Sequence, residues 1–197
     1  MSNFSFFLDQ GFKHILDWNA YDHLLFLVVL SAPYLIKQWR KLLALITLFT
    51  IGHTLSLVLS VYDLVKVNMS VVEFLIPLTI IFTAAINIFK SRRKNTAEKP
   101  WGHWIATLAF GIIHGFGFST LFKMMIASAS QKATPLLAYT LGIEFAQILI
   151  VLVVLIISFI VISLLRFSLR DWVIIISAII IGRILPIFAE ACEALSI

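Results

Sequence analysis

Six ionisable side chains stand in or beside long apolar runs of this sequence, where an uncompensated charge is costly. All are imidazoles or carboxylates, and they are His14, Asp22, His23, His53, His114 and Glu144. Imidazole nitrogen and carboxylate oxygen suit zinc, nickel, cobalt or iron, and a divalent cation would compensate several buried charges at once. We therefore expect these residues to hold a divalent transition metal. The single cysteine, Cys192, lies far along the chain, which disfavours copper(I) and iron–sulfur chemistry.

Membrane helices must position these residues, because 61% of the 197 residues are hydrophobic and the mean hydropathy is +1.03. A bilayer core of about 30 Å needs roughly 20 apolar residues per helix. Six such runs stand between charge clusters, at about residues 22–37, 42–62, 71–89, 101–126, 135–165 and 172–188. Before them, residues 4–18 read as an amphipathic helix that lies at the interface or dips into it. The predicted fold class is all-α, a polytopic membrane bundle of about six transmembrane helices plus an N-terminal amphipathic helix.

Basic residues are distributed unevenly between the loops. Ten Lys and Arg fall in the loops on one side of the six runs and four on the other, so the richer side is predicted to be cytoplasmic and both termini to be outside. Residues 90–100 then form a cytoplasmic loop between two three-helix halves. His103 lies near the cytoplasmic end of its run and is interpreted as an ordinary interfacial residue. Because the basic residues occur in loop clusters between apolar runs, nucleic-acid binding is not expected.

The two halves show no convincing repeat, so residues 1–197 are predicted to form one transmembrane domain, with an interfacial helix at residues 1–20. Small residues on the fourth run, Gly111, Gly115 and Gly117, predict close helix packing. Membrane lipid and a metal ion are the expected partners. The sequence leaves homo-oligomerisation open.

Three of the candidate ligands are expected to lie at the same depth in the membrane. His53, His114 and Glu144 each lie roughly 12 to 14 Å beneath the outer surface at 1.5 Å per residue, so three helices bring one ionisable group to the same level. Asp22 and His23 open a short apolar run, which implies that this helix starts below the surface or that the preceding segment folds inward. Either arrangement lets them approach the same level.

Simpler interpretations exist for several of these residues. A single membrane histidine is often only a hydrogen-bond partner of a neighbouring helix, and Glu144 could be a protonated acid bonded to Gln147. Asp17 and Glu73 read as solvated charges at helix ends. Arg183, a permanent cation midway along the last run, is expected to form a structural ion pair with Glu144 or Glu190.

Five ordered motifs resemble the HupE/UreJ family of hydrogenase- and urease-associated bacterial membrane proteins, in its short form. They read GFKHI at residues 11–15, YDHLLFL at 21–27, FTIGHTLSL at 49–57, FGIIHGFGF at 110–118 and LGIEFAQ at 141–147. The resemblance implies a small polytopic protein of the bacterial inner membrane that takes up nickel or cobalt. It also implies that the six candidate ligands named above occupy the family's motif positions.

Three functions are compatible with such a site. A metal carrier would bind the cation from outside and release it inward, although the inner half offers few polar groups beyond Asn87, Ser91 and Ser163. A zinc-dependent intramembrane hydrolase acting on a lipid-like substrate would use Glu144 or Asp22 as the general base, with Ser56 or Ser119 nearby. A closed structural site would only brace the helices. The carrier is the preferred prediction, with nickel, cobalt or zinc as the ion.

Overall fold

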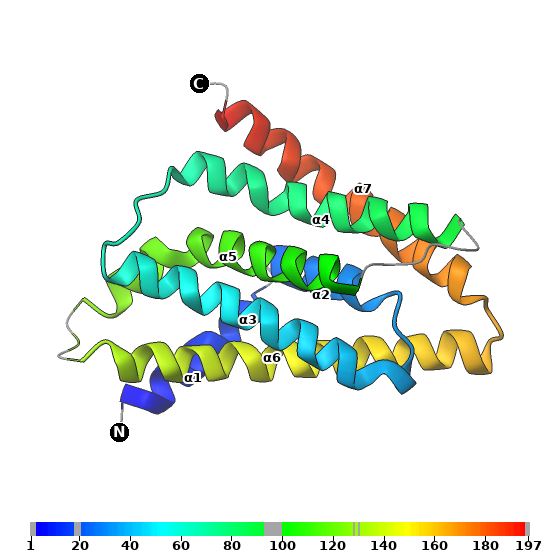
Figure 1. Cartoon of the computed structure of the whole chain (residues 1–197), viewed down its shortest axis with the longest axis horizontal. Helices are drawn as coiled ribbons and strands as arrows, with labels where there is room; N and C mark the ends of the chain where they lie inside the picture. Colours follow the sequence, from blue (N-terminus) through cyan, green and yellow to red (C-terminus); the bar gives the residue numbers. More distant parts are fainter. Residues whose placement is uncertain (1–2, 18–20, 93–99, 128, 130, 196–197) are drawn as a thin grey trace.

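The computed structural model describes residues 3–17, 21–92, 100–127, 129 and 131–195. These residues form helices joined by short connections, and the predicted all-α class is confirmed. The α-helices are α1 (Asn3–Ile15), α2 (Asp22–Ser31), α3 (Trp39–Val61), α4 (Met69–Arg92), α5 (Pro100–Met125), α6 (Ala133–Phe159) and α7 (Leu169–Leu195). A 3-10 turn, η1 (Ile36–Gln38), precedes α3, and a π-helical turn, η2 (Ile160–Leu164), continues α6. Figure 1 shows the helices gathered along one long axis.

In the part of the chain that the structure describes, five segments are long and apolar enough to cross a membrane. They are Ile36–Val61, Met69–Arg92, Trp101–Met125, Ala133–Leu164 and Leu169–Leu195. The predicted second to sixth runs agree closely with them, except that α7 continues to Leu195 rather than ending near residue 188. The protein is therefore a multi-pass membrane protein, because such apolar helices bury their outer faces in lipid.

The predicted first span is shorter than expected. α2 ends at Ser31 rather than near Lys37, and its 10 residues extend about 15 Å, half of a bilayer core. Pro33 accounts for the early end, since proline has no N–H to donate to the carbonyl of Val29, which accepts a hydrogen bond from Asn87 at 2.7 Å instead. The prediction of about six spans is thus confirmed in outline, as five long helices and one short apolar one.

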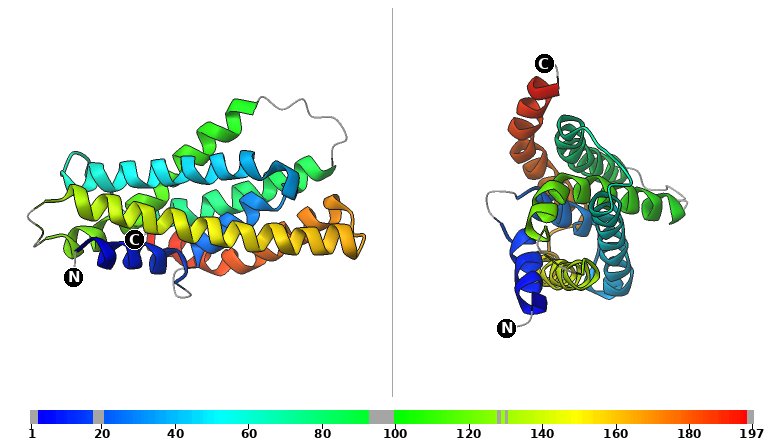
Figure 2. Two further views of the ribbon diagram at one scale, coloured as in Figure 1. Left: turned by 90° about the horizontal axis from the view of Figure 1, so that it is seen from below. Right: turned by 90° about the vertical axis from the view of Figure 1, so that its left-hand side faces the viewer.

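α1 packs into the bundle, which is the second of the two placements expected from its amphipathic pattern. Phe7 and Ile15 are buried, and α1 crosses α6 at two glycines. A Cβ on Gly11 would overlap the carbonyl of Tyr139, and a Cβ on Gly142 would overlap the backbone of α1. Figures 1 and 2 show α1 beside the first part of α6 and α2 further along the bundle, so the two short helices follow one another through its length.

Glycines also hold α3 against α5, as predicted for two of the three small residues singled out on α5. A Cβ on Gly111 would overlap the carbonyl of Phe49, and a Cβ on Gly115 would overlap the carbonyl of His53. Gly117 faces α4 instead, where an added Cβ would lie 2.7 Å from the end of the Ile76 side chain and 3.8 Å from Val72, without meeting backbone. Backbone contact at Gly111 and Gly115 therefore fixes the height of α3 relative to α5.

We call the end of the bundle that carries Lys41, Lys90 and Arg170 the basic end. There α3, α5 and α7 begin, and α4 and η2 end. The first turns of α5 lean away from the other helices at this end (Figure 2). Of the loop predicted at residues 90–100, residues 93–99 lie outside the described part of the chain.

Candidate metal centre

Four histidines from four helices converge in the interior. His14 comes from the last turn of α1, His23 from the first turn of α2, His53 from α3 and His114 from α5. Their ring centroids lie 4.7 Å apart for His14 and His23, 5.6 Å for His23 and His53, 5.9 Å for His14 and His53, and 5.1 Å for His23 and His114. The structure thus brings together all four histidines that the sequence proposed.

Two of these histidines lie at the same height because their helices run side by side in the same direction. His53 is 14 residues after the start of α3 (53 − 39) and His114 is 14 residues after the start of α5 (114 − 100), which places both about 21 Å from the basic end. The interruption between α1 and α2 falls beside them. His14 and His23 reach the cluster from the two sides of this interruption.

Three of the imidazoles could share one ion. One ring nitrogen from each of His14, His23 and His53 lies within 4.8 Å of the other two. The Nε2 atoms of all four histidines are buried and make no hydrogen bond among the residues that the structure describes, and the same holds for Nδ1 of His53. Leaving a buried polar atom unpaired costs about 1–3 kcal/mol, so an ion that binds several of these nitrogens removes a real penalty.

Two histidines are oriented by their Nδ1 atoms. Asp22 Oδ1 lies 3.0 Å from Nδ1 of His23 and also accepts the backbone N–H of His23 at 2.8 Å. His114 donates Nδ1–H to the carbonyl of Phe110 at 2.8 Å. Since both partners are acceptors, the ring proton sits on Nδ1 and Nε2 keeps its lone pair toward the cluster. Such outer hydrogen bonds are typical of histidines that bind metals.

Glu144 lies outside the three-histidine group, in a groove between α3 and α6. Its carboxylate accepts hydrogen bonds from Thr47, at 2.6 Å, and from Thr50. Thr50 Oγ1 also lies 2.9 Å from Oε1 of Gln147, so the expected link between Glu144 and Gln147 runs through a threonine. The groove has a volume of about 470 Å³ and is lined by Thr54 and Thr140 as well.

The two serines suggested as polar neighbours of a hydrolytic site are engaged with the backbone. Ser56 donates to the carbonyl of His53 at 2.7 Å, and Ser119 donates to the carbonyl of Phe116 at 2.7 Å. The carboxylate of Asp22 is likewise bound to His23. These contacts explain the three side chains without a substrate.

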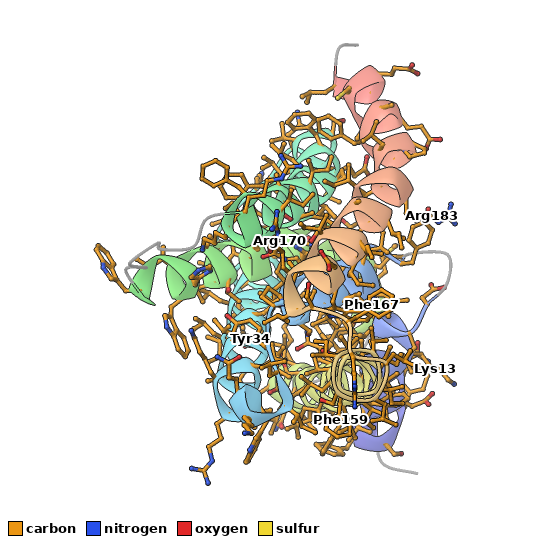
Figure 3. The ribbon with its side chains drawn as sticks, turned by 90° about the vertical axis from the view of Figure 1, so that its right-hand side faces the viewer. Lys13, Tyr34, Phe159, Phe167, Arg170 and Arg183 are labelled. Atoms are coloured by element: carbon orange, nitrogen blue, oxygen red, sulfur yellow. The ribbon has the colours of Figure 1, made fainter. Side chains whose placement is uncertain are left out.

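Arg183 does not form the predicted ion pair. Among the described residues it pairs with neither Glu144 nor Glu190, and its guanidinium lies 4.7 Å from the ring centroid of Tyr21. Figure 3 shows Arg183 at the surface of the bundle. The exposed guanidinium thus makes a cation–π contact with this ring in place of the ion pair. His103 lies close to Lys90 at the basic end, away from the cluster.

Three phenylalanines that the sequence reasoning passed over form a floor beneath the histidines, which we call the aromatic layer: Phe26, Phe49 and Phe110. The rings of Phe26 and Phe49 stack at 4.8 Å, and their centroids lie 5.3 and 5.2 Å from that of His114. Spacing could have revealed this layer, since each phenylalanine stands three or four residues from a site histidine, one helical turn toward the basic end. The layer keeps the cluster dry on that side.

Comparison with known proteins identifies a family. A family model described as HupE / UreJ protein matches residues 1–191. No curated protein and no solved structure gives a significant match. The matched region includes every residue of the cluster.

Proposed function

The chain belongs to the HupE/UreJ family, and from this premise we propose that it binds a divalent transition metal at His14, His23 and His53 and carries it across the membrane. Nickel or cobalt is the proposed cargo. The observation that supports this most directly is the convergence of three imidazoles, two of them buried and that of His14 partly buried, whose ligand atoms lie within 4.8 Å of one another. Neutral imidazole is a favoured ligand of these metals, and nothing else in the described chain uses these lone pairs.

The surroundings of the three histidines support a cation site. Asp22 holds the ring of His23 and adds a negative charge at its edge. His114 presents an unused Nε2 beside His23 and is the proposed fourth nitrogen donor. The aromatic layer excludes water on one side, which strengthens any interaction between the ion and its ligands. A metal bound here would be the cargo, held by neutral nitrogens that allow its release.

We further propose that the protein lies in the bacterial inner membrane with the basic end in the cytoplasm and both termini outside. The support is the excess of Lys and Arg in the loops of that end. In this orientation the metal would enter from the outside. It would then have to displace the aromatic layer to move further, so the arrangement described here is closed toward the cytoplasm.

Metal binding is tested with the purified full chain in nanodiscs, loaded with nickel or cobalt, washed and analysed for metal. We expect about one ion per chain for the wild type and none for His53→Ala, because a lost ligand costs more than the roughly 10- to 100-fold typical of an outer partner. His103→Ala is the matched control, since it removes an imidazole remote from the cluster and should retain the ion. Full retention by a His23→Ala/His53→Ala double variant would contradict the site.

Transport is tested with proteoliposomes and radiolabelled nickel or cobalt. Uptake should require His53 and should be unaffected by His103→Ala. If the wild type binds metal but transports none, the proposed transport is wrong and the proposed metal site is retained. In that event, cleavage of lipid amides or esters, compared with and without a chelator, would decide whether the ion is catalytic.

A further inference from the structure

A second cavity, with a volume of about 410 Å³, opens at the basic end between α2, α3, α4, α5 and α7. Lys41, Lys90 and Arg170 line it, from α3, α4 and α7 respectively. Figure 3 looks onto this end and labels Arg170 and Tyr34. Tyr34 also lines the cavity. We call it the basic cavity, and none of the four site histidines contributes to it.

The side chains of the basic cavity favour an anion. Two lysines and one arginine line the cavity, and no carboxylate does so among the described residues. Neither Lys41 nor Arg170 pairs with a carboxylate in the described chain; Lys41 lies over the ring of Tyr34, with Nζ 5.5 Å from the centroid. The nearby carboxylate of Asp171 accepts the hydroxyl of Ser168 instead. Lys90 Nζ lies 2.6 Å from Nε2 of His103, which also lines the cavity. The like charges of Lys41 and Arg170 repel each other unless an anion joins them.

The position of the three basic residues along their helices indicates which kind of anion the cavity would bind. Lys41 stands in the first turn of α3, Arg170 in the first turn of α7 and Lys90 in the last turn of α4. The ends of spanning helices lie at the level of the lipid headgroups, where phosphates are concentrated. Ammonium and guanidinium groups bind phosphate oxygens well, and the guanidinium can engage two at once. The volume is within the range of small-molecule sites.

The lining of the cavity away from the cations is uncharged. Phe26, Phe110 and Leu30 contribute apolar surface beside Thr83 and Thr107, so an organic group attached to the phosphate would meet no charge there. Phe26 and Phe110 also belong to the aromatic layer, which places the floor of the basic cavity against the underside of the histidine cluster. From the cavity, its charges and its level we propose that it binds a phosphate group, carried by an anionic phospholipid or by a free phosphate.

Two arms of one experiment distinguish the sources. In the first, the full chain is reconstituted in nanodiscs of equal parts phosphatidylcholine and phosphatidylglycerol, and the lipids that it retains are identified by native mass spectrometry. In the second, binding of inorganic phosphate to lipid-free protein in detergent is measured by equilibrium dialysis. Retention of phosphatidylglycerol alone identifies the lipid as the source, and phosphate binding identifies the free anion; either supports the shared chemistry.

The variant that tests the site is Lys41→Gln/Arg170→Gln, with Arg40→Gln/Arg166→Gln as its matched control. The control removes the same charge from exposed positions of the same end that do not line the cavity. We expect the first pair to lower binding about thirtyfold, because each of the two lost charges contributes the attraction that is typical of one basic residue near an anionic surface. The control should change binding little. Lys41→Arg/Arg170→Lys, which keeps both charges, should retain binding and guards against a folding defect. Absence of binding in both arms, or equal losses in the two Gln pairs, would overturn the proposal.

Discussion

The histidine cluster and the basic cavity lie on opposite sides of one aromatic layer, yet they have opposite chemistry. Above the layer, neutral nitrogens with unused lone pairs and one carboxylate favour a cation. Below it, Lys41, Lys90 and Arg170 surround a space without an acidic lining residue in the described chain. Lys41 lies 12 residues before His53 on α3, so about 18 Å of helix, with the aromatic layer in between, separates the cations from the region suited to a metal. The difference indicates that the layer, and not a gradual change in polarity, divides the molecule.

The largest expected effect follows from removing the imidazole that α1 contributes. His14→Ala should lower metal affinity at least about 100-fold, since it removes one of three converging ligands. Phosphate or lipid binding at the basic end should not change. Metal titration calorimetry of this variant beside Lys13→Ala, an exposed neighbour on the same turn, makes the measurement. Equal affinities for the two variants would exclude α1 from the site.

Gly115→Ala tests whether the backbone contact between α3 and α5 sets the position of His53. The added methyl would overlap the hydroxyl of Ser56 and the carbonyl of His53. We expect a loss of about 1–3 kcal/mol in the free energy of unfolding, as for other overpacked sites, together with weaker metal binding. Gly182→Ala is the control, because nothing lies within 4 Å of its added methyl. Equal melting temperatures for the two variants would contradict the role of this contact.

Asp22→Asn should lower metal affinity at the histidine cluster moderately and leave the basic cavity unaffected. The carboxylate orients His23 without being one of the three converging ligands, and loss of such an outer partner typically costs about tenfold or more in metal affinity. Asp63→Asn removes an exposed carboxylate that pairs with Lys123 and should leave the affinity unchanged. An effect of Asp22→Asn as large as that of His14→Ala would make Asp22 a direct ligand.

The smallest effect on metal binding is expected from Glu144→Gln. Because the carboxylate is bonded to Thr47 and Thr50, metal affinity should change by less than about threefold, as for ordinary substitutions away from the ligands. The melting temperature should fall slightly as the threonine contacts weaken. Thr54→Val, which disturbs the same groove at its hydrogen bond with Thr140, serves as the comparison. A loss of about 100-fold would instead place Glu144 among the ligands, as its motif position suggests.

Much of this arrangement follows from one-dimensional features of the chain. The lengths of the apolar runs predict α3 to α7, because a bilayer demands a minimum of uninterrupted hydrocarbon from any spanning helix. Counting residues from the helix ends also predicts that His53 and His114 share a level. Glu144 shows the limit of this reasoning, since depth says nothing about the direction in which a side chain leaves its helix.

That direction is decided by tertiary packing. Backbone contacts at Gly111 and Gly115 turn His53 and His114 inward, and the contact at Gly142 presses α1 against α6. The interruption between α1 and α2 then lets His14 meet His23, a pairing that no fixed helical spacing predicts.

The basic cavity likewise exists only in three dimensions, because its cations come from three separate helices. The sequence by itself determined which segments lie in lipid and which in water, through their hydropathy. It also determined the depth of each residue along its helix, through the fixed helical rise. Only the folded bundle decided which side chains face each other, since this depends on how closely neighbouring backbones can approach.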